Sequence, residues 1–442
     1  MSDNRADLII RARWTAPVAP DDAVLENHAL VVRGECIVDL LPAPLAAQKW
    51  QAAETLELDR HLLIPGLINT HTHAAMSLLR GLADDLPLMV WLEQHIWPTE
   101  ARWVDESFVR DGTRLAAAEM IRSGTTCFGD MYFHPDTTAR AAMEAGLRAV
   151  VCSPVFDSPS PMGEGPEDYL RIATETIDSW RHEPRLTLGF GPHAPYTISD
   201  DPLLRIQTLA EELDAPIMMH VHETAGEIQQ AVAATGERPL ARLARLGLLS
   251  PRLLAVHMTQ LTDEEIAQLA QTGTSVAHCP ESNLKLASGF TPVQRLLEAG
   301  VNVALGTDGA ASNNDLDMIG EMRCAALLAK GVSLRADAVP AATALRMATL
   351  NGARALGLEA QTGSLEIGKQ ADIIAVDLGA PETQPVYDPV AQLVYAASRE
   401  QVSHSWVAGR CLMAERRLIT LNPAQLIKAA EGWQRKINGE KP

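Results

Sequence analysis

Four short apolar segments, far apart in the chain, are each followed by a polar residue that can bind a metal or move a proton. The segments and these residues are 62–70 with His71, 215–219 with His220, 253–256 with His257, and 301–307 with Asp308. Near-continuous hydrophobic runs of this length are typical of strands buried on both faces of a parallel sheet. Because the carboxyl ends of parallel barrel strands converge on one face, the four polar residues are expected to meet there.

The segments between these strands have the pattern of amphipathic helices, for example at residues 114–122 and 264–270. Strands alternating with helices predict βα units around a parallel sheet, hence an α/β protein. The length of this region, about 300 residues, suits a (β/α)8 TIM-type barrel with insertions. A doubly wound sheet is the alternative, but it would gather ligands from four strand ends less readily.

Both ends of the chain return to β patterns. Residues 1–60 contain short strands, and residues 362–377 contain a further strand signal that could pair with them. We therefore predict a barrel over residues 61–361. Residues 1–60 and 362–442 would together form a small discontinuous β-sandwich domain, and a surface helix is expected at about 423–437.

Composition and charge narrow the class of protein. The 442 residues are 47% hydrophobic and 21% charged, as in soluble globular proteins, and the formal net charge is −19. Without a basic cluster to follow a phosphate backbone, the chain is not expected to bind nucleic acid. Neither a secretion signal nor a membrane-spanning stretch is recognisable. The six cysteines lack CxxC spacing, so we expect a cytoplasmic protein without disulfides.

The pair His71 and His73 is the strongest local signal for chemistry. Side chains two residues apart in a strand point the same way, so both imidazoles would face one point at the strand end. Imidazole nitrogen is a preferred ligand of zinc and its first-row neighbours. Each histidine alone is equally explained as a buried structural residue. The metal hypothesis therefore depends on the combination with His220 and Asp308.

Six short motifs add detail to this site. They are PGLINTHTH at 65–73, GPHAPY at 191–196, HVHET at 220–224, HMTQ at 257–260, SNLKL at 282–286 and GTDGAASNN at 306–314. In this combination and order, the chain resembles the amidohydrolase superfamily over essentially its full length, and within it the 5′-methylthioadenosine/S-adenosylhomocysteine deaminases. The resemblance implies hydrolytic removal of the 6-amino group of 5′-substituted adenosines, including 5′-methylthioadenosine, S-adenosylhomocysteine and adenosine. The products would be the inosine analogue and ammonia.

The resemblance implies that His71, His73, His220 and Asp308 bind one divalent metal ion per subunit, with zinc the expected ion. Such an ion leaves a position for water and lowers the pKa of that water to about 7. Relatives with two metals typically bridge them with a carbamylated lysine. The chain has no lysine between residues 49 and 285, so a single metal is expected.

Three residues are expected to carry the catalytic chemistry by the same resemblance. Asp308 would accept the proton of the attacking water as well as bind the metal, and Glu223 would carry a proton to the purine ring nitrogen. His257 would stabilise the developing charge without binding the metal. Both carboxylates would thus also contact the substrate.

Substrate recognition is expected to involve Glu100 and His193. The resemblance places His193 near the purine ring and Glu100 on the ribose, where a carboxylate can accept hydrogen bonds from both hydroxyls. From the residues alone, a solvated carboxylate at a helix start is the better explanation of Glu100, and only the resemblance favours ribose binding. Some relatives bind the homocysteine carboxylate with arginines, but residues 151–163 contain none, which favours an uncharged 5′-thioether.

Three further residues have open roles. Trp91 could form an aromatic wall for the base or belong to the core. His222 is expected on the same strand face as His220, as a residue supporting the ligands. His278 could face the pocket or be structural.

Other functions share these motifs. A guanine or 8-oxoguanine deaminase, or a triazine chlorohydrolase, would use the same metal site, but a free base has no diol for Glu100 to hold. A non-catalytic scaffold is disfavoured, because it need not keep every residue of the set. Family members often associate, so a homo-oligomer is also expected.

Overall fold

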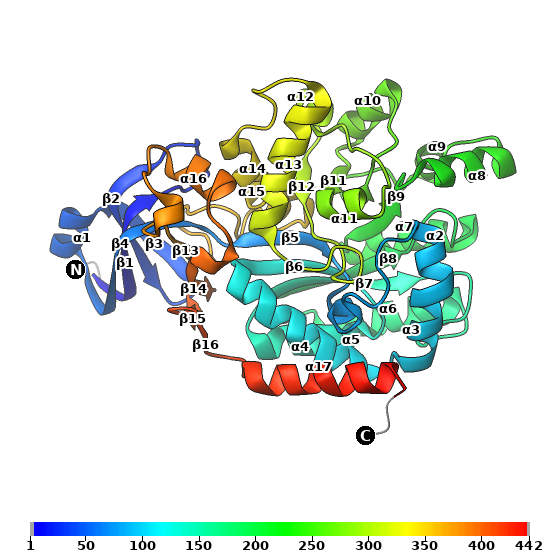
Figure 1. Cartoon of the computed structure of the whole chain (residues 1–442), viewed down its shortest axis with the longest axis horizontal. Coiled ribbons are helices and arrows are strands. Elements are labelled where there is room, and N and C mark those ends of the chain that lie inside the picture. Colours follow the sequence, from blue (N-terminus) through cyan, green and yellow to red (C-terminus); the bar gives the residue numbers. More distant parts are fainter. Residues whose placement is uncertain (1–3, 440–442) are drawn as a thin grey trace.

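The structure is a computed structural model that describes residues 4–439, and its larger unit is a near-closed barrel of eight parallel strands (Figure 1). In order around the barrel, the strands are β5 (Leu67–Thr72), β6 (Thr125–Met131), β7 (Arg148–Val155), β8 (Leu186–Pro192), β9 (Ile217–Val221), β10 (Leu253–His257), β11 (Ser275–His278) and β12 (Val303–Leu305). The predicted barrel is confirmed.

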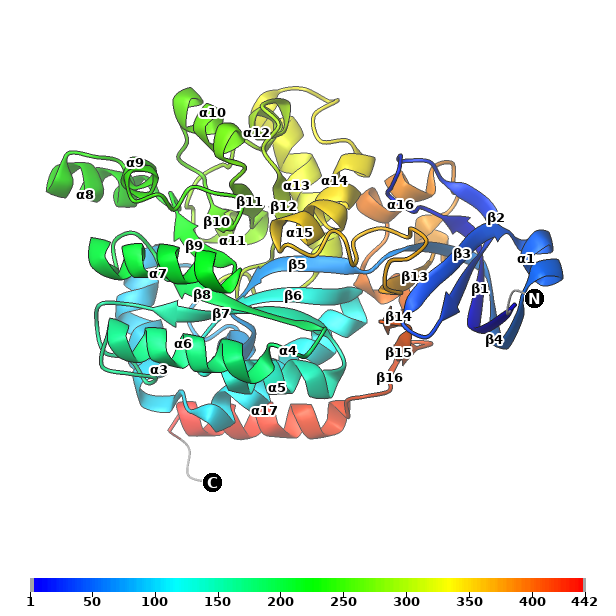
Figure 2. The same cartoon turned by 180° about the vertical axis from the view of Figure 1, so that it is seen from behind.

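Helices alternate with these strands and surround the barrel (Figure 2). They are α4 (Glu106–Ser123), α5 (Pro135–Ala145), α6 (Pro166–Trp180), α7 (Asp200–Leu213), α8 (Ala225–Thr235), α9 (Pro239–Arg245), α10 (Asp263–Thr272), α11 (Pro280–Lys285), α12 (Val293–Glu298), α13 (Met318–Ser333), α14 (Ala341–Met347) and α15 (Leu350–Ala355). The helices predicted at 114–122 and 264–270 lie within α4 and α10. Local sequence fixes the ends of α4: the Asp105 side chain accepts from the Phe108 N–H, and Gly124 ends the helix with a φ of 91°.

The barrel closes between its first and last strands through side chains as well as backbone. Asn69 on β5 exchanges two hydrogen bonds with Thr307, at 2.7 and 2.9 Å, and the Thr70 hydroxyl donates to Leu305 O at 2.8 Å. The backbone N–H of Asp308 donates to His71 O at 3.0 Å. The closure therefore brings the residues that follow β12 directly against the histidines at the end of β5.

The second unit is one mixed sheet built from both ends of the chain, which confirms the small discontinuous β domain. Its strands, in spatial order, are β16 (Arg417–Leu418), β15 (Arg410–Ala414), β14 (Val402–Val407), β13 (Ile373–Asp377), β4 (Gln51–Pro65), β1 (Arg5–Thr15), β2 (Leu25–Arg33) and β3 (Cys36–Pro42). β13 pairs antiparallel with β4, and apolar side chains of N- and C-terminal strands share one core. The strand signal at 362–377 becomes regular strand only from Ile373.

Short helices and the C-terminal helix complete the fold. The sheet carries α1 (Ala43–Lys49), α16 (Pro389–Tyr395) lies near α13 and α14, and α17 (Pro423–Ile437) runs along α4 as the surface helix predicted there. None of the helices within residues 4–439 combines the length and apolar character needed to span a bilayer.

A buried ion pair links the barrel to the small sheet. Arg148, at the start of β7, is 1% exposed, and its Nε lies 2.9 Å from Oδ2 of Asp372, just before β13. The other oxygen of Asp372 accepts from the Ala408 N–H at 2.7 Å. The pair therefore joins the amino-terminal end of the barrel, opposite the carboxyl ends of its strands, to two segments of the second unit.

Replacing Asp372 with alanine is expected to lower the free energy of unfolding by about 3–5 kcal/mol, because the Arg148 guanidinium is left buried without its charge partner. Urea unfolding measures the loss. The control is Glu359→Ala, which breaks an ion pair with Arg354 between side chains 50% and 53% exposed. This pair should contribute less than about 1 kcal/mol. Similar losses in both variants would contradict a special role for the buried pair.

Candidate metal centre and active site

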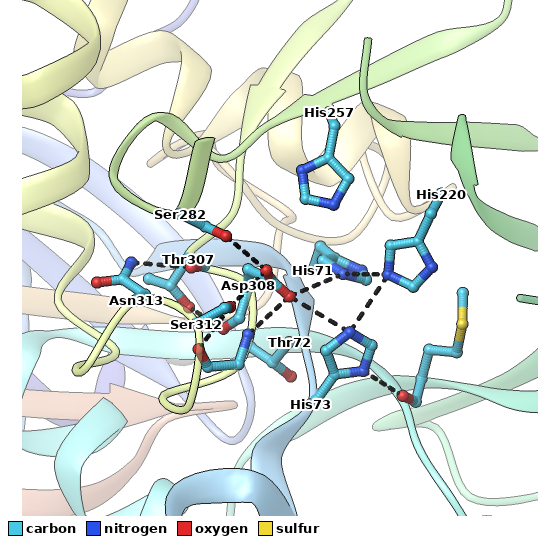
Figure 3. Close-up of polar contacts among 12 residues, drawn as sticks. His71, Thr72, His73, His220, His257, Ser282, Thr307, Asp308, Ser312 and Asn313 are labelled. Carbon is cyan, nitrogen blue, oxygen red and sulfur yellow. Dashed lines mark hydrogen bonds and ion pairs between the residues drawn. The ribbon is translucent and has the colours of Figure 1, made fainter. Parts of the chain in front are cut away.

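Three histidines and one aspartate gather at the carboxyl end of the barrel (Figure 3). His220 Nε2 lies 3.2 Å from His71 Nε2 and 3.3 Å from His73 Nε2. Asp308 Oδ1 lies 3.4 and 3.3 Å from the same two nitrogens. Ligands held about 2.0–2.1 Å from a zinc ion in tetrahedral arrangement lie at such separations from one another. The four residues predicted as ligands thus form a cluster that fits one first-row divalent ion.

The imidazoles are held so that Nε2 faces the cluster. His73 Nδ1 donates to Met131 O at 2.5 Å, and His220 Nδ1 donates to His193 O at 2.7 Å. Such bonds fix the ring orientation and make Nε2 the nitrogen that can bind a metal. Burial lowers the pKa of His71 to about 4 and that of His220 well below its usual value, which favours the neutral form that a metal requires.

Asp308 and the histidines of the cluster shift one another's pKa values. Burial by itself lowers the pKa of His73, but its hydrogen bond and charge contact with Asp308 raise that pKa to about 9. Burial would raise the pKa of Asp308, yet the hydrogen bonds from His71 and His73 hold it well below the usual range. Asp308 is therefore a carboxylate at neutral pH, available as a ligand and a proton acceptor.

The Asp308 side chain is fixed by its neighbours. Oδ2 accepts from Ser282 Oγ at 2.7 Å and from Ser312 Oγ at 2.6 Å, and Oδ1 accepts from the Gly309 N–H at 2.8 Å. The residue has a φ of 64°, in the left-handed region that aspartate enters more readily than most other non-glycine residues. A Cβ at Gly306 would lie only 2.8 Å from His71 N, so glycine is needed for β12 to approach β5 so closely.

A cavity of about 580 Å³ opens beside the cluster. Its volume lies within the range of small-molecule sites. Glu100, His193, Glu223 and His257 all line it together with Asp308, so every predicted catalytic or substrate residue reaches one space. No lysine or arginine side chain among the described residues lines it.

One side of the cavity is covered by a separate helical segment. It comprises α2 (Leu88–Trp91), a π-helical turn at Leu92–Ile96 and α3 (Trp97–Trp103). Figure 1 shows α2 and α3 at the end of the barrel away from the small sheet. Trp91 is 6% exposed and lines the cavity, so it forms part of an aromatic and aliphatic wall.

Glu100 is buried at the inner surface of α3. Its Oε1 accepts a hydrogen bond from the Tyr132 hydroxyl at 2.7 Å, and the exposed fraction of the residue is 8%. Burial raises the pKa of Glu100 to about 7, against the opposing effect of the Tyr132 hydrogen bond. A buried carboxylate facing a cavity is costly unless a ligand pairs with it, so Glu100 is not a solvated carboxylate at a helix start.

Glu223 and His257 lie close together in the lining of the cavity. His257 Nδ1 lies 2.9 Å from Asn283 Oδ1, to which it donates, and His257 Nε2 is 3.9 Å from Glu223 Oε2. Burial raises the pKa of Glu223, with a smaller opposing effect from His257. The protonated form of Glu223 is therefore favoured more than in a solvated glutamate, as proton donation requires.

His222 and His278, whose roles were open, do not belong to the metal cluster. The φ of 53° at His222 ends the strand alternation, so the prediction that it shares a face with His220 is wrong: its Nε2 accepts from the Leu240 N–H at 3.1 Å. His278 is buried at the end of β11 and lines a separate cavity of about 360 Å³ with Phe290 and Val293.

Several residues at the site were not predicted. Tyr132 follows the end of β6, and the rule that strand ends carry function could have found it. Asn283 and Ser312 lie within recognised motifs, but only the fold shows which atoms they hold.

An eight-stranded barrel with such a cluster at the carboxyl ends of its strands is typical of metal-dependent hydrolases. The amidohydrolase family model matches residues 62–412, and the chain belongs to this family. This confirms the family indicated by the motifs.

Individual relatives cover nearly the whole chain. A 5-methylthioadenosine/S-adenosylhomocysteine deaminase from Saccharophagus degradans is 52% identical over 99% of this chain and 98% of its own. The structure of an adenosine deaminase from Xanthomonas campestris with bound zinc is 50% identical, covers 99% of both chains and has a TM-score of 0.98. An atrazine chlorohydrolase from Arthrobacter aurescens is 22% identical, covers 96% of this chain and 99% of its own, and has a TM-score of 0.90, which shows a shared fold alone.

Proposed function

We propose that the protein is a metal-dependent deaminase that converts 5′-substituted adenosines, above all 5′-methylthioadenosine, to the inosine analogue and ammonia. The observation that carries the proposal is a buried cluster of three histidines and one aspartate, opening on a cavity that also contains Glu100 and Glu223. The names of relatives with 50–52% identity support the same activity.

One zinc ion per subunit is proposed for the cluster formed by His71, His73, His220 and Asp308. When bound there, such an ion makes a hydroxide nucleophile available near neutral pH. The six free thiols are consistent with action in a reducing cytoplasm.

Two carboxyl side chains are proposed to accept and donate the protons of the reaction. Asp308, held by Ser282 and Ser312, is proposed to accept the proton lost by the attacking water. Glu223, whose pKa is raised by burial, donates a proton to the purine nitrogen next to the attacked carbon. His257 is proposed to stabilise the charge that develops beside the metal cluster, while Asn283 fixes its ring through Nδ1.

Substrate binding is proposed to depend on two further residues that line the cavity. Glu100 would accept hydrogen bonds from both ribose hydroxyls, and the Tyr132 hydroxyl would orient its carboxylate. His193 would contact the purine ring. Its ring lies next to that of Phe156, with centroids 5.3 Å apart, and burial lowers the pKa of His193 to about 3, so it remains neutral.

An ultraviolet assay with the zinc-loaded protein and 5′-methylthioadenosine tests the proposed function. We expect the adenine chromophore to become hypoxanthine, and His71→Ala to abolish the change. If the protein binds zinc but converts no nucleoside while it acts on guanine or a triazine, the nucleoside assignment is wrong. A free base would leave the buried Glu100 without a ligand partner.

Glu100→Gln is expected to raise the KM for 5′-methylthioadenosine about 10- to 100-fold, because an amide cannot accept hydrogen bonds from two hydroxyls equally well. In the native protein, the pKa near 7 means that Glu100 becomes protonated as the pH falls below 7, so KM should rise there. Initial rates between pH 5.5 and 8.5 measure both effects. A KM of the variant that equals the native value would contradict ribose binding by Glu100.

The side chains that line the cavity determine which 5′ substituent is expected to bind best. Because no lysine or arginine among residues 4–439 lines the cavity, the charged amino acid group of S-adenosylhomocysteine would lose water without gaining such an ionic partner. We therefore expect kcat/KM for 5′-methylthioadenosine to exceed that for S-adenosylhomocysteine by about 10- to 100-fold. Competition between the two substrates in one reaction measures the ratio directly. Equal values would require a charge-binding group outside the cavity.

A further inference from the structure

The turn that follows β9 has a strained backbone. His222 and Glu223 lie between the metal-cluster residue His220 and the start of α8, and His222 adopts a φ of 53°. A non-glycine residue in this left-handed conformation has a free-energy cost and persists only where surrounding contacts hold it. The conformation matters because it ends the strand and places Glu223 at the cavity.

All four backbone polar groups of these two residues are held. On the carbonyl side, the Thr259 N–H donates to His222 O at 2.9 Å, and the Thr259 hydroxyl donates to Glu223 O at 2.7 Å. On the amide side, both N–H groups donate to one carboxylate, that of Glu227. The distances are 3.0 Å from His222 N to Oε1 and 2.7 Å from Glu223 N to Oε2.

The position of Glu227 in α8 explains this reach. Thr224 caps the helix, with its hydroxyl accepting from the Glu227 N–H at 3.2 Å. In an ordinary capping box, the glutamate at this position accepts from the N–H of the cap residue itself. Here the carboxylate accepts instead from the two residues before the cap, and the side chain is buried, with Glu227 8% exposed.

The Glu223 carboxylate has weak contacts of its own. The Ser288 hydroxyl is 3.5 Å from Oε1, and His257 Nε2 is 3.9 Å from Oε2. Its location is therefore determined mainly by the backbone to which it is attached. Glu227 lies outside the cavity lining and cannot touch a substrate there, yet it fixes that backbone.

We propose that Glu227 is a positioning residue, which sets the place of the Glu223 carboxylate by binding the amides of His222 and Glu223. This inference rests on the proposed function for its kinetic consequences. A mispositioning of about 1 Å can lower a catalytic rate about 100-fold. Glu227→Gln, which can accept from only one of the two N–H groups, is expected to lower kcat about 10- to 100-fold, while KM and the zinc content stay within about twofold.

A double-mutant cycle tests whether Glu227 acts through Glu223. In the Glu223→Gln background, adding Glu227→Gln should lower kcat by less than about threefold, because there is no proton donor left to position. Glu227→Asp keeps the charge with a shorter side chain and should recover part of the kcat lost in Glu227→Gln. Glu212→Gln, on the exposed surface of α7, controls for the loss of one carboxylate. An equal loss of kcat in both backgrounds would overturn the proposal.

Hydrogen exchange supplies a measurement that is independent of turnover. In Glu227→Gln, the amides of His222 and Glu223 should exchange faster, while the amides of β9 keep their native protection. If the native protein deaminates no nucleoside, the proposed function fails, but faster exchange at these two amides would still establish the anchoring contact. Unchanged exchange would exclude it.

Discussion

Asp308→Asn is expected to lower kcat/KM for 5′-methylthioadenosine by about 10³- to 10⁴-fold and to reduce the zinc content of the purified protein. Asparagine keeps the size of the side chain, but it removes the negative charge that lies 3.3–3.4 Å from the nitrogens of His71 and His73. The variant would thus lose both a metal ligand and the proposed proton acceptor.

Metal analysis and initial rates together measure this effect. The matched control is Asp214→Asn at the end of α7, where the side chain is 87% exposed and the φ is 52°, a conformation that asparagine tolerates well. It should retain native metal content and rate. If Asp308→Asn binds zinc normally and turns over at more than about a tenth of the native rate, then Asp308 has neither proposed role.

The cluster could be predicted because it depends on the barrel rather than on local detail. If the apolar runs are parallel strands, their carboxyl ends share one face of the barrel. The residues that end these runs, His71, His220 and Asp308, must then lie near one another. The same reasoning found His257. The small β unit was also recognisable, because its strands differ from the barrel strands in pattern. Its pairing of β4 with β13 depends on contacts across more than 300 residues.

The sequence could not predict contacts that arise where regular periodicity ends. Alternation in a strand placed His222 beside His220, but the left-handed conformation at His222 turns its ring toward Leu240 instead. The bond between Tyr132 and Glu100 joins a barrel strand end to an inserted helical segment, and no short pattern connects the two. Glu227 looks like an ordinary glutamate in the first turn of a helix. Its contacts follow from the conformation of the turn before that helix.

A variant at Glu223 can test proton delivery without disturbing metal binding. Its carboxylate lies outside the group of four ligand residues, and burial raises its pKa. A neutral amide of the same shape should therefore leave the metal site intact while removing the transferable proton. We expect Glu223→Gln to lower kcat for 5′-methylthioadenosine by about 10²- to 10⁴-fold, with a full complement of zinc and a KM within about threefold of the native value.

The choice of substrate makes this test specific to proton delivery. A purine nucleoside with a better leaving group than ammonia at position 6 depends less on protonation of the ring nitrogen. With 6-chloropurine riboside, which loses chloride, the Glu223→Gln variant should therefore keep a larger fraction of the native rate than it does with 5′-methylthioadenosine. Equal fractional losses on the two substrates, or a variant that loses its zinc, would instead mean that Glu223 supports the structure of the site and does not carry the proton.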